Sequence, residues 1–160
     1  MPSVNNPSLV DATFQSPLTL ASPNNPAADA NGNIQVQPGD RLPGIPLNQL
    51  KFGADYRITP EWTFGGVVTY FSSQFLRGDE SNQNAPIPGY AVLNLHSSYT
   101  VTEHLELFVN VNNVTDTRYA TFGAYGDPTG VNAPWIPPGA VTNGPGVNNR
   151  FLGPGAPLSV

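Results

Sequence analysis

The chain has 160 residues, the size of one modest domain, but only 11% of them are charged, and its 16 Gly and 18 Pro gather in a few stretches. The net charge of −5 and the scatter of the six Lys and Arg exclude nucleic acid as a partner, because neutralising phosphates requires clustered cations. The lack of Cys excludes disulfides, thiolate metal sites and cysteine nucleophiles, and no apolar run approaches the roughly 20 residues of a membrane helix.

Two alternating segments begin the chain. A short one near residues 9–15 permits a strand, and residues 48–58 form a clearer one, in which Leu50 and Phe52 alternate with polar or charged residues. Because successive side chains of a strand point to opposite faces, this second segment is predicted to have one apolar and one polar face. The stretch between the two, residues 16–46, contains many chain-breaking residues and is predicted to be a long loop.

Two hairpins of one design are predicted from residue 48 onward. The turn at residues 59–61 reverses the chain, and a second short turn follows some forty residues later, beyond a polar loop. A very long Gly/Pro-rich loop is predicted from about Phe122 to Pro157. The further predicted strands cover residues 62–76, 89–101 and 105–121, with the start of a last strand near 157–160.

The connections alternate between short and long, and this order indicates a membrane-spanning β-barrel. Outer-membrane barrels have tight turns on the periplasmic side and long loops outside, and their strands need roughly 9–11 residues to cross the hydrocarbon layer. The fold class is therefore predicted to be all-β, an antiparallel transmembrane β-barrel fragment with long external loops. The aromatic residues predicted to meet the membrane interface are Tyr56, Trp62, Tyr70, Tyr90 and Tyr99.

Two motifs late in the alternating region resemble a known family. Residues 88–95 (PGYAVLNL) and 108–119 (FVNVNNVTDTRY) are similar to two of the last strands of TonB-dependent receptor barrels, and residues 39–56 resemble an earlier loop and strand. The resemblance covers about residues 10–121 and identifies the chain as the C-terminal part of such a barrel. The residues that carry the second motif are Asn112, Asn113, Asp116 and Tyr119.

The resemblance implies a 22-stranded barrel with an N-terminal plug in the outer membrane of a Gram-negative bacterium, of which this chain supplies about five strands. Such receptors take up iron–siderophore complexes, cobalamin or other scarce nutrients with force transmitted by TonB. The implied partners are outer-membrane lipid, the plug, the TonB complex and the nutrient ligand. The sequence contains no plug, no TonB-binding segment and no closing strand with a C-terminal aromatic residue, so we expect the chain alone to transport nothing.

Two groups of residues are candidates for contact with the plug or the ligand. Lumen residues of a barrel more often contact the plug or water than form a ligand path, and exposed loop residues tolerate change, so each group also has a purely structural interpretation. The residues predicted to face the barrel lumen are Lys51, Asp55, Arg57, Asn94 and His96. The residues predicted to contact ligand from external loops are Arg77, Asp79, Tyr125 and Trp135.

Catalysis and metal binding are not predicted. His96 has no second His or carboxylate beside it in the pattern, and no nucleophile elbow, phosphate loop or carboxylate pair stands in a fitting context. We therefore predict no catalytic residue, no metal site, no cofactor and no enzyme activity.

One rival interpretation is a secreted soluble β-sandwich that binds carbohydrate or protein through Trp- and Tyr-bearing loops. Its outward faces would carry Lys and Glu, whereas the polar face here is mostly Asn, Ser, Thr and Gly, which favours a barrel lumen. A non-specific porin is a further possibility, and it would differ from the receptor in the motifs and in the plug.

Overall fold

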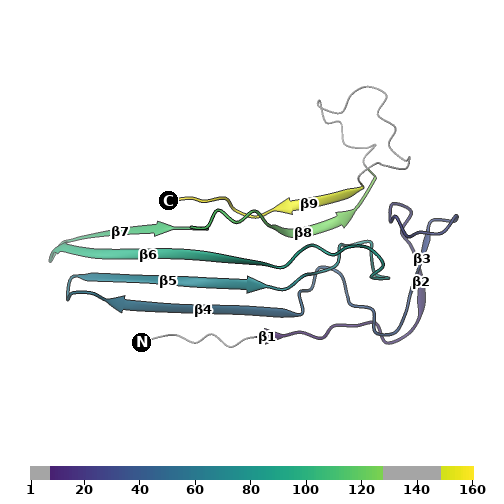
Figure 1. Ribbon diagram of the computed structural model, residues 1–160, viewed down its shortest axis with the longest axis horizontal. Helices are drawn as coiled ribbons and strands as arrows, with labels where there is room; N and C mark the ends of the chain where they lie inside the picture. The colour runs from purple at the N-terminus through teal and green to yellow at the C-terminus, as the bar shows by residue number, and fades with distance from the viewer. Residues whose placement is uncertain (1–7, 128–148) are drawn as a thin grey trace, which may run out of the picture.

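The computed structural model describes residues 8–127 and 149–160, and the secondary structure of these residues is entirely β. No helix in the described residues has the length and apolar character needed to cross a membrane. The strands, shown in Figure 1, are β1 (Ser8–Leu9), β2 (Leu18–Ala21), β3 (Asn33–Val36), β4 (Asn48–Arg57), β5 (Trp62–Phe71), β6 (Tyr90–Thr102), β7 (Leu105–Val111), β8 (Ala120–Tyr125) and β9 (Arg150–Pro154).

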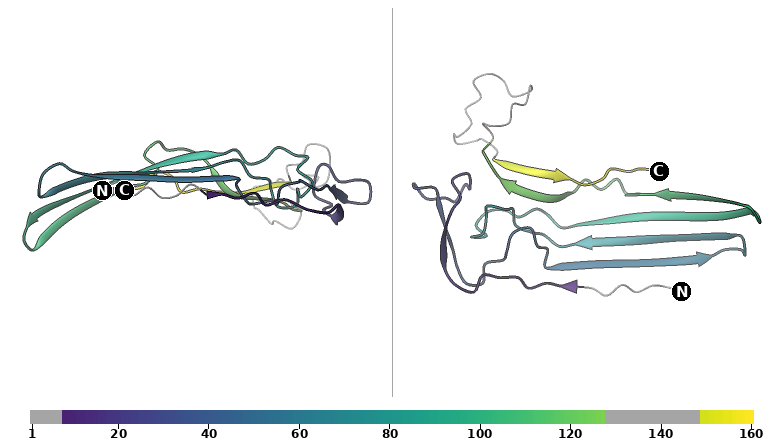
Figure 2. Two further views of the ribbon diagram at one scale, coloured as in Figure 1. Left: turned by 90° about the horizontal axis from the view of Figure 1, so that it is seen from below. Right: turned by 180° about the vertical axis from the view of Figure 1, so that it is seen from behind.

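One antiparallel sheet dominates the structure, with its strands in the order β1-β4-β5-β6-β7. The four long strands lie side by side in Figure 1, and the edge-on view in Figure 2 shows that they form one curved layer. Within the described residues, neither the β2–β3 pair nor the β8–β9 pair packs on a face of these strands. The predicted all-β antiparallel class is confirmed, and the described sheet is open, not a closed barrel.

The two ends of the sheet differ in their connections. The two short turns, at residues 58–61 and 103–104, lie at one end, which we call the turn end. The opposite end carries the long connections and the β2–β3 and β8–β9 pairs, and we call it the loop end (Figure 1). This distribution follows the predicted order of short and long connections.

The register gathers most apolar side chains on one face of the sheet and most polar side chains on the other. Phe52 on β4 is opposite Val68 on β5, which is opposite Leu93 on β6. Because side chains alternate along every strand, the neighbouring positions align on the other face. The apolar face comprises Leu50, Phe52, Tyr56, Trp62, Phe64, Val68, Tyr70, Leu93, Leu95, Tyr99, Leu107 and Val109. The other face, which we call the polar face, carries Gln49, Lys51, Asp55, Arg57, Thr63, Thr69, Asn94, His96, Ser98, Thr100, Glu106 and Asn110, with Val67, Phe71, Tyr90, Val92 and Phe108 among them.

The apolar face does not cover a core. Phe52, Tyr56 and Leu107 are 50%, 72% and 56% exposed. Contiguous apolar surface of this kind marks contact with a membrane or another protein, because a soluble protein rarely leaves it in water. The buried hydrophobic residues lie mostly in the loop-end segments: Ile34, Val36, Leu76, Ile87 and Val92.

Short pairings build the loop end and correct two predicted loops. The long loop predicted over residues 16–46 contains the β2–β3 hairpin, in which Leu18 is opposite Val36. The loop predicted from Phe122 starts later, because β8 runs to Tyr125 and pairs with β9. Neither strand pair produces a long alternating pattern in the sequence, because each strand has only four to six residues.

The predicted strand limits also change. The strand near residues 9–15 is restricted to Ser8–Leu9, and the strand over 62–76 ends at Phe71, beyond which single bridges replace continuous pairing.

The strand predicted over residues 105–121 is interrupted after Val111. Asn113 and Asp116 have φ values of 51° and 48°, in the left-handed region that breaks an extended strand. Close to this break, Ser159 forms an antiparallel bridge with Asn112, at the position predicted for the start of a last strand.

Candidate functional site

The polar face contains all five residues predicted to line a lumen. Asp55 is opposite Gly65, and Gly65 is opposite His96, so the carboxylate and the imidazole lie on either side of one strand. Lys51 and Arg57 lie on β4 at alternate positions with Asp55, and Asn94 precedes His96 by one alternation on β6. The register therefore brings the predicted set onto one surface.

His96 and Asp55 form a side-chain hydrogen bond that the sequence pattern did not indicate. The distance from Nε2 of His96 to Oδ1 of Asp55 is 2.6 Å, and the two side chains are 37% and 54% exposed. The expectation that His96 has no carboxylate neighbour is wrong, because the register places Asp55 two strands away on the same face. The available signal was Gly65, whose missing side chain leaves room for the pair to cross β5.

Metal binding gains no support from this pair. Within the described residues, no group of three or more His, Cys, Asp or Glu is close enough to hold a metal ion. Asn94, the remaining polar candidate on β6, is already engaged, because its Oδ1 accepts a hydrogen bond of 2.8 Å from the backbone N–H of Asn113.

Asp79, expected at a ligand surface, is instead completely buried. Its Oδ1 accepts hydrogen bonds from Nδ2 of Asn84 at 2.9 Å and from Nδ2 of Asn25 at 3.2 Å, and its Oδ2 accepts one from the backbone N–H of Asn84 at 3.1 Å. Asn25 is also buried, and its Nδ2 donates to the carbonyl of Gly78 at 2.6 Å. Asp79 therefore joins two loops and does not present its carboxylate to solvent.

Arg77 and Tyr125 lie on neighbouring segments. The N–H of Arg77 donates to the carbonyl of Gly123 at 2.9 Å, and the N–H of Tyr125 donates to the carbonyl of Arg77 at 2.8 Å. The side chain of Arg77 is exposed, and Tyr125 is half-buried. Burial raises the pKa of Tyr125, the Asp79 carboxylate raises it further, and Arg150 partly opposes them, so its hydroxyl stays protonated at neutral pH.

Trp135, the fourth predicted ligand contact, lies outside the described residues.

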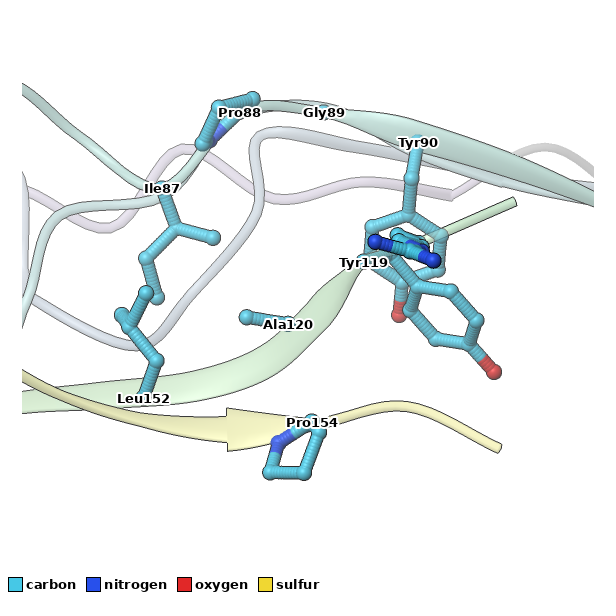
Figure 3. A pocket seen from close by; sticks show the side chains of 9 residues that line it. Ile87, Pro88, Gly89, Tyr90, Tyr119, Ala120, Leu152 and Pro154 are labelled. Carbon is cyan, nitrogen blue, oxygen red and sulfur yellow. The ribbon is translucent and has the colours of Figure 1, made fainter. Parts of the chain in front are cut away.

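A cavity of about 370 Å³ opens at the loop end, between the start of β6 and the β8–β9 pair. Figure 3 shows Ile87 and Leu152 near one side of it and the rings of Tyr90 and Tyr119 near the other. These two rings are stacked, with centroids 4.3 Å apart and planes inclined by 27°. From the sequence, Tyr119 was predicted only as a motif residue and Tyr90 only as a membrane-interface residue.

Tyr90 does not lie on the apolar face with the other aromatic residues predicted to meet the membrane interface. It is opposite Phe71 on β5 and shares its face with Asn94 and His96, which is the polar face. The rings of Tyr90 and Phe71 are 5.2 Å apart. The sequence did not reveal the cavity because its walls come from three separate segments, within residues 87–90, 118–120 and 152–154.

The motif residue Asn113 is a structural clamp. It is 1% exposed, its Oδ1 accepts a hydrogen bond from the N–H of Thr117 at 2.9 Å, and its Nδ2 donates to the carbonyls of Thr117 and Ala156, both at 3.0 Å. The neighbouring Asn112 is exposed and pairs through its backbone with Ser159. Asn113 thus fixes the break after β7 and attaches the segment that follows β9.

Asp116, also from this motif, is exposed and carries the second left-handed φ of the break. Its Oδ1 lies 3.5 Å from the backbone N of Leu158, at the limit of a hydrogen bond.

Residues 11–114 match a family model described as TonB dependent receptor-like, beta-barrel. The chain belongs to the TonB-dependent receptor family. It is 33% identical over 99 residues to the ferric-pyoverdine 358 receptor of Pseudomonas putida, a match that covers 56% of this chain and 12% of the relative. It is 26% identical over 120 residues to the metal-pseudopaline receptor CntO of Pseudomonas aeruginosa, covering 72% of this chain and 16% of that relative.

The fold of this TonB-dependent receptor chain also matches a solved structure. The crystal structure of the siderophore receptor PiuA from Acinetobacter baumannii aligns with a TM-score of 0.52 and 21% identity, covering 60% of this chain and 14% of that one. At this identity the likeness shows the fold alone. The chain spans less than a fifth of the length of the curated relatives, and the family match contains the polar face but ends before Tyr119.

Proposed function

We propose that the chain forms part of the wall of an outer-membrane receptor that takes up metal–siderophore complexes or similar scarce nutrients. The observation that carries the proposal is the single-layer sheet with one exposed apolar face and one polar face. Two relatives are named as receptors for ferric-pyoverdine and metal-pseudopaline, which supports the cargo class. Because the two relatives are named for different cargoes, we assign the class of cargo and not an individual nutrient.

The apolar face supports the membrane location. β4 and β5 each have ten residues, the length that a tilted strand needs to cross the hydrocarbon layer. Tyr56, Trp62 and Tyr99 gather at the turn end of this face, where aromatic residues meet the interface. Nε1 of Trp62 donates to Oγ of Ser97 at 2.9 Å, so its polar group keeps a partner outside water.

The polar face supports a lumen. Its contact between His96 and Asp55 and its Asn, Ser and Thr residues suit a wet interior in contact with a plug. The open edges of the described sheet leave backbone groups that cost several kcal/mol each in lipid. We therefore infer that the sheet works only within a closed barrel with plug and TonB, and that it is inactive by itself.

The rival β-sandwich would need a second sheet on the apolar face, and the described residues provide none. We assign no catalysis, in keeping with relatives that are named as receptors.

The test is uptake by cells. The receptor gene that encodes this chain is expressed in a bacterium that lacks its own siderophore receptors, and accumulation of radioactive iron is measured with ferric siderophores of several classes. We expect accumulation of one class that stops when TonB is deleted, with the receptor in the outer-membrane fraction. Recovery of this chain as a soluble monomer without detergent would refute the proposal.

A further inference from the structure

The loop-end cavity has the size and walls of a small-molecule site. Its volume of about 370 Å³ lies within the range of about 300–1,000 Å³ typical of ligand pockets. Apolar residues form most of the lining: Ile87, Pro88, Ala120, Leu152 and Pro154. Such walls favour a ligand with a compact apolar body over a sugar or a hydrated ion.

The aromatic side of the cavity is fixed in place. Tyr90 lies between Phe71 and Tyr119, with ring centroids at 5.2 Å and 4.3 Å. Tyr119 also lies directly against Gly155, where an added Cβ would overlap the ring. Because these contacts already hold the rings, little conformational entropy would be lost when a ligand binds.

One cation borders this apolar surface. Arg118 lines the cavity and is exposed, and it forms no ion pair with any carboxylate of the described residues. A guanidinium is planar and binds carboxylates through two parallel hydrogen bonds. The chain as a whole is acidic, with a net charge of −5, so attraction of an anion to this cavity depends on the local charge of Arg118.

From these features we propose that the cavity binds an aromatic carboxylate, with the ring between the apolar walls and the edges of Tyr90 and Tyr119 and the carboxylate on Arg118. The inference rests on the proposed receptor function, in which the cavity would hold an aromatic acid group of the cargo. The cavity opens beside the polar face at the loop end, so a ligand would reach it from the side of the long loops.

Benzoate is the direct probe, with benzamide as its neutral analogue and acetate as an anion without a ring. Binding to the detergent-purified receptor that contains this chain is measured by saturation-transfer NMR and calorimetry. We expect benzoate to bind more tightly than benzamide and acetate to give no saturable signal. Arg118→Gln should weaken benzoate binding about tenfold or more and leave benzamide unchanged, whereas Arg118→Lys should retain part of the benzoate affinity.

A second variant tests the walls independently. Leu152→Ser should weaken benzoate and benzamide alike, because it removes apolar contact without touching the cation. Benzoate and acetate binding equally well, benzoate binding that survives Arg118→Gln, or the absence of binding would each overturn the assignment.

The cargo uptake assay separates the two proposals. Iron uptake by a receptor that binds no benzoate would refute the cavity assignment alone. Benzoate binding by a receptor that takes up no cargo would refute the proposed function and leave the cavity assignment in place.

Discussion

His96 and Asp55 are joined by a 2.6 Å contact although their strands, β6 and β4, are not neighbours. The strand between them, β5, presents Gly65 at the level where the two side chains meet. A Cβ built at Gly65 would collide with the Asp55 carboxylate and with the His96 ring. The pair therefore depends on the absence of a side chain at one position of a third strand.

Gly65→Ala is expected to separate His96 from Asp55. The added methyl group has no room unless both side chains move, and such overpacking costs about 1–3 kcal/mol. The measurement is the midpoint of heat- or urea-induced unfolding of the receptor that contains this chain, in detergent.

Gly53→Ala is the matched control for this change. Gly53 lies on β4, on the same face of the sheet as Gly65. The atom nearest to its added Cβ is Cγ2 of Val67 at 3.2 Å, so the neighbour needs to shift only slightly. Equal losses of stability in the two variants would show that the His96–Asp55 pair contributes nothing beyond the general cost of a methyl group.

Arginine at two adjacent positions of β5 should distinguish the two faces. Val68 lies on the apolar face and is 40% exposed, and Val67 lies on the other face between Gly53 and Asn94. Val68→Arg is expected to destabilise the barrel by about 2–4 kcal/mol and to reduce the amount of receptor in the outer membrane. Val67→Arg should cost about 1 kcal/mol or less, because its side chain can reach water. A larger loss of stability for Val67→Arg than for Val68→Arg would contradict the assignment of the apolar face to lipid.

Asn113→Ala is expected to loosen the attachment of the segment after β9. The change removes the hydrogen bonds to the N–H and carbonyl of the half-buried Thr117 and to the carbonyl of Ala156, and it puts Ala at a φ of 51°. We expect a loss of about 2–4 kcal/mol in the urea unfolding of the receptor.

Asn112→Ala controls for the position in the chain. Asn112 is exposed and its side chain makes one long hydrogen bond, 3.4 Å to Oγ of Ser159, so its replacement should cost about 0.5 kcal/mol or less. Similar losses for both residues would contradict the assignment of Asn113 as the clamp.

Asp79→Asn should weaken the attachment between the β2–β3 and β5–β6 loops without unfolding the sheet. The amide group that replaces one carboxylate oxygen would face N–H donors of Asn84 or Asn25, and it would leave at least one of them unpaired. Faster tryptic cleavage after Arg77, at an unchanged unfolding midpoint, is the expected result. Gln83→Ala, at an exposed position of the same loop, should leave the cleavage rate as it is.

The sheet could be predicted from the sequence because its signal is local. Alternation with a period of two, as in Leu50 and Phe52 against Lys51, places each side chain on a face before any partner strand is known. The same reasoning predicts the all-β antiparallel class, which is confirmed, and it places Lys51, Asp55 and His96 on one surface.

The loop-end features depend on contacts between distant segments. Asp79 looks like an exposed loop residue until Asn25, 54 residues earlier, is placed beside it. Tyr90 and Tyr119 stack across the break at Asn113, which lies between them in the chain. The His96–Asp55 pair follows from the register and not from any spacing along the chain. No rule of composition or periodicity contains this information.

The hydrogen bonds between Asn25, Gly78 and Asp79 have a consequence for protein engineering. They connect the loop between β2 and β3 with the loop between β5 and β6, which are separate in sequence. A chimera that takes one of these loops from another receptor would leave a buried carboxylate or a buried amide without its counterpart. The two loops therefore need to be transplanted together, as a single exchangeable unit.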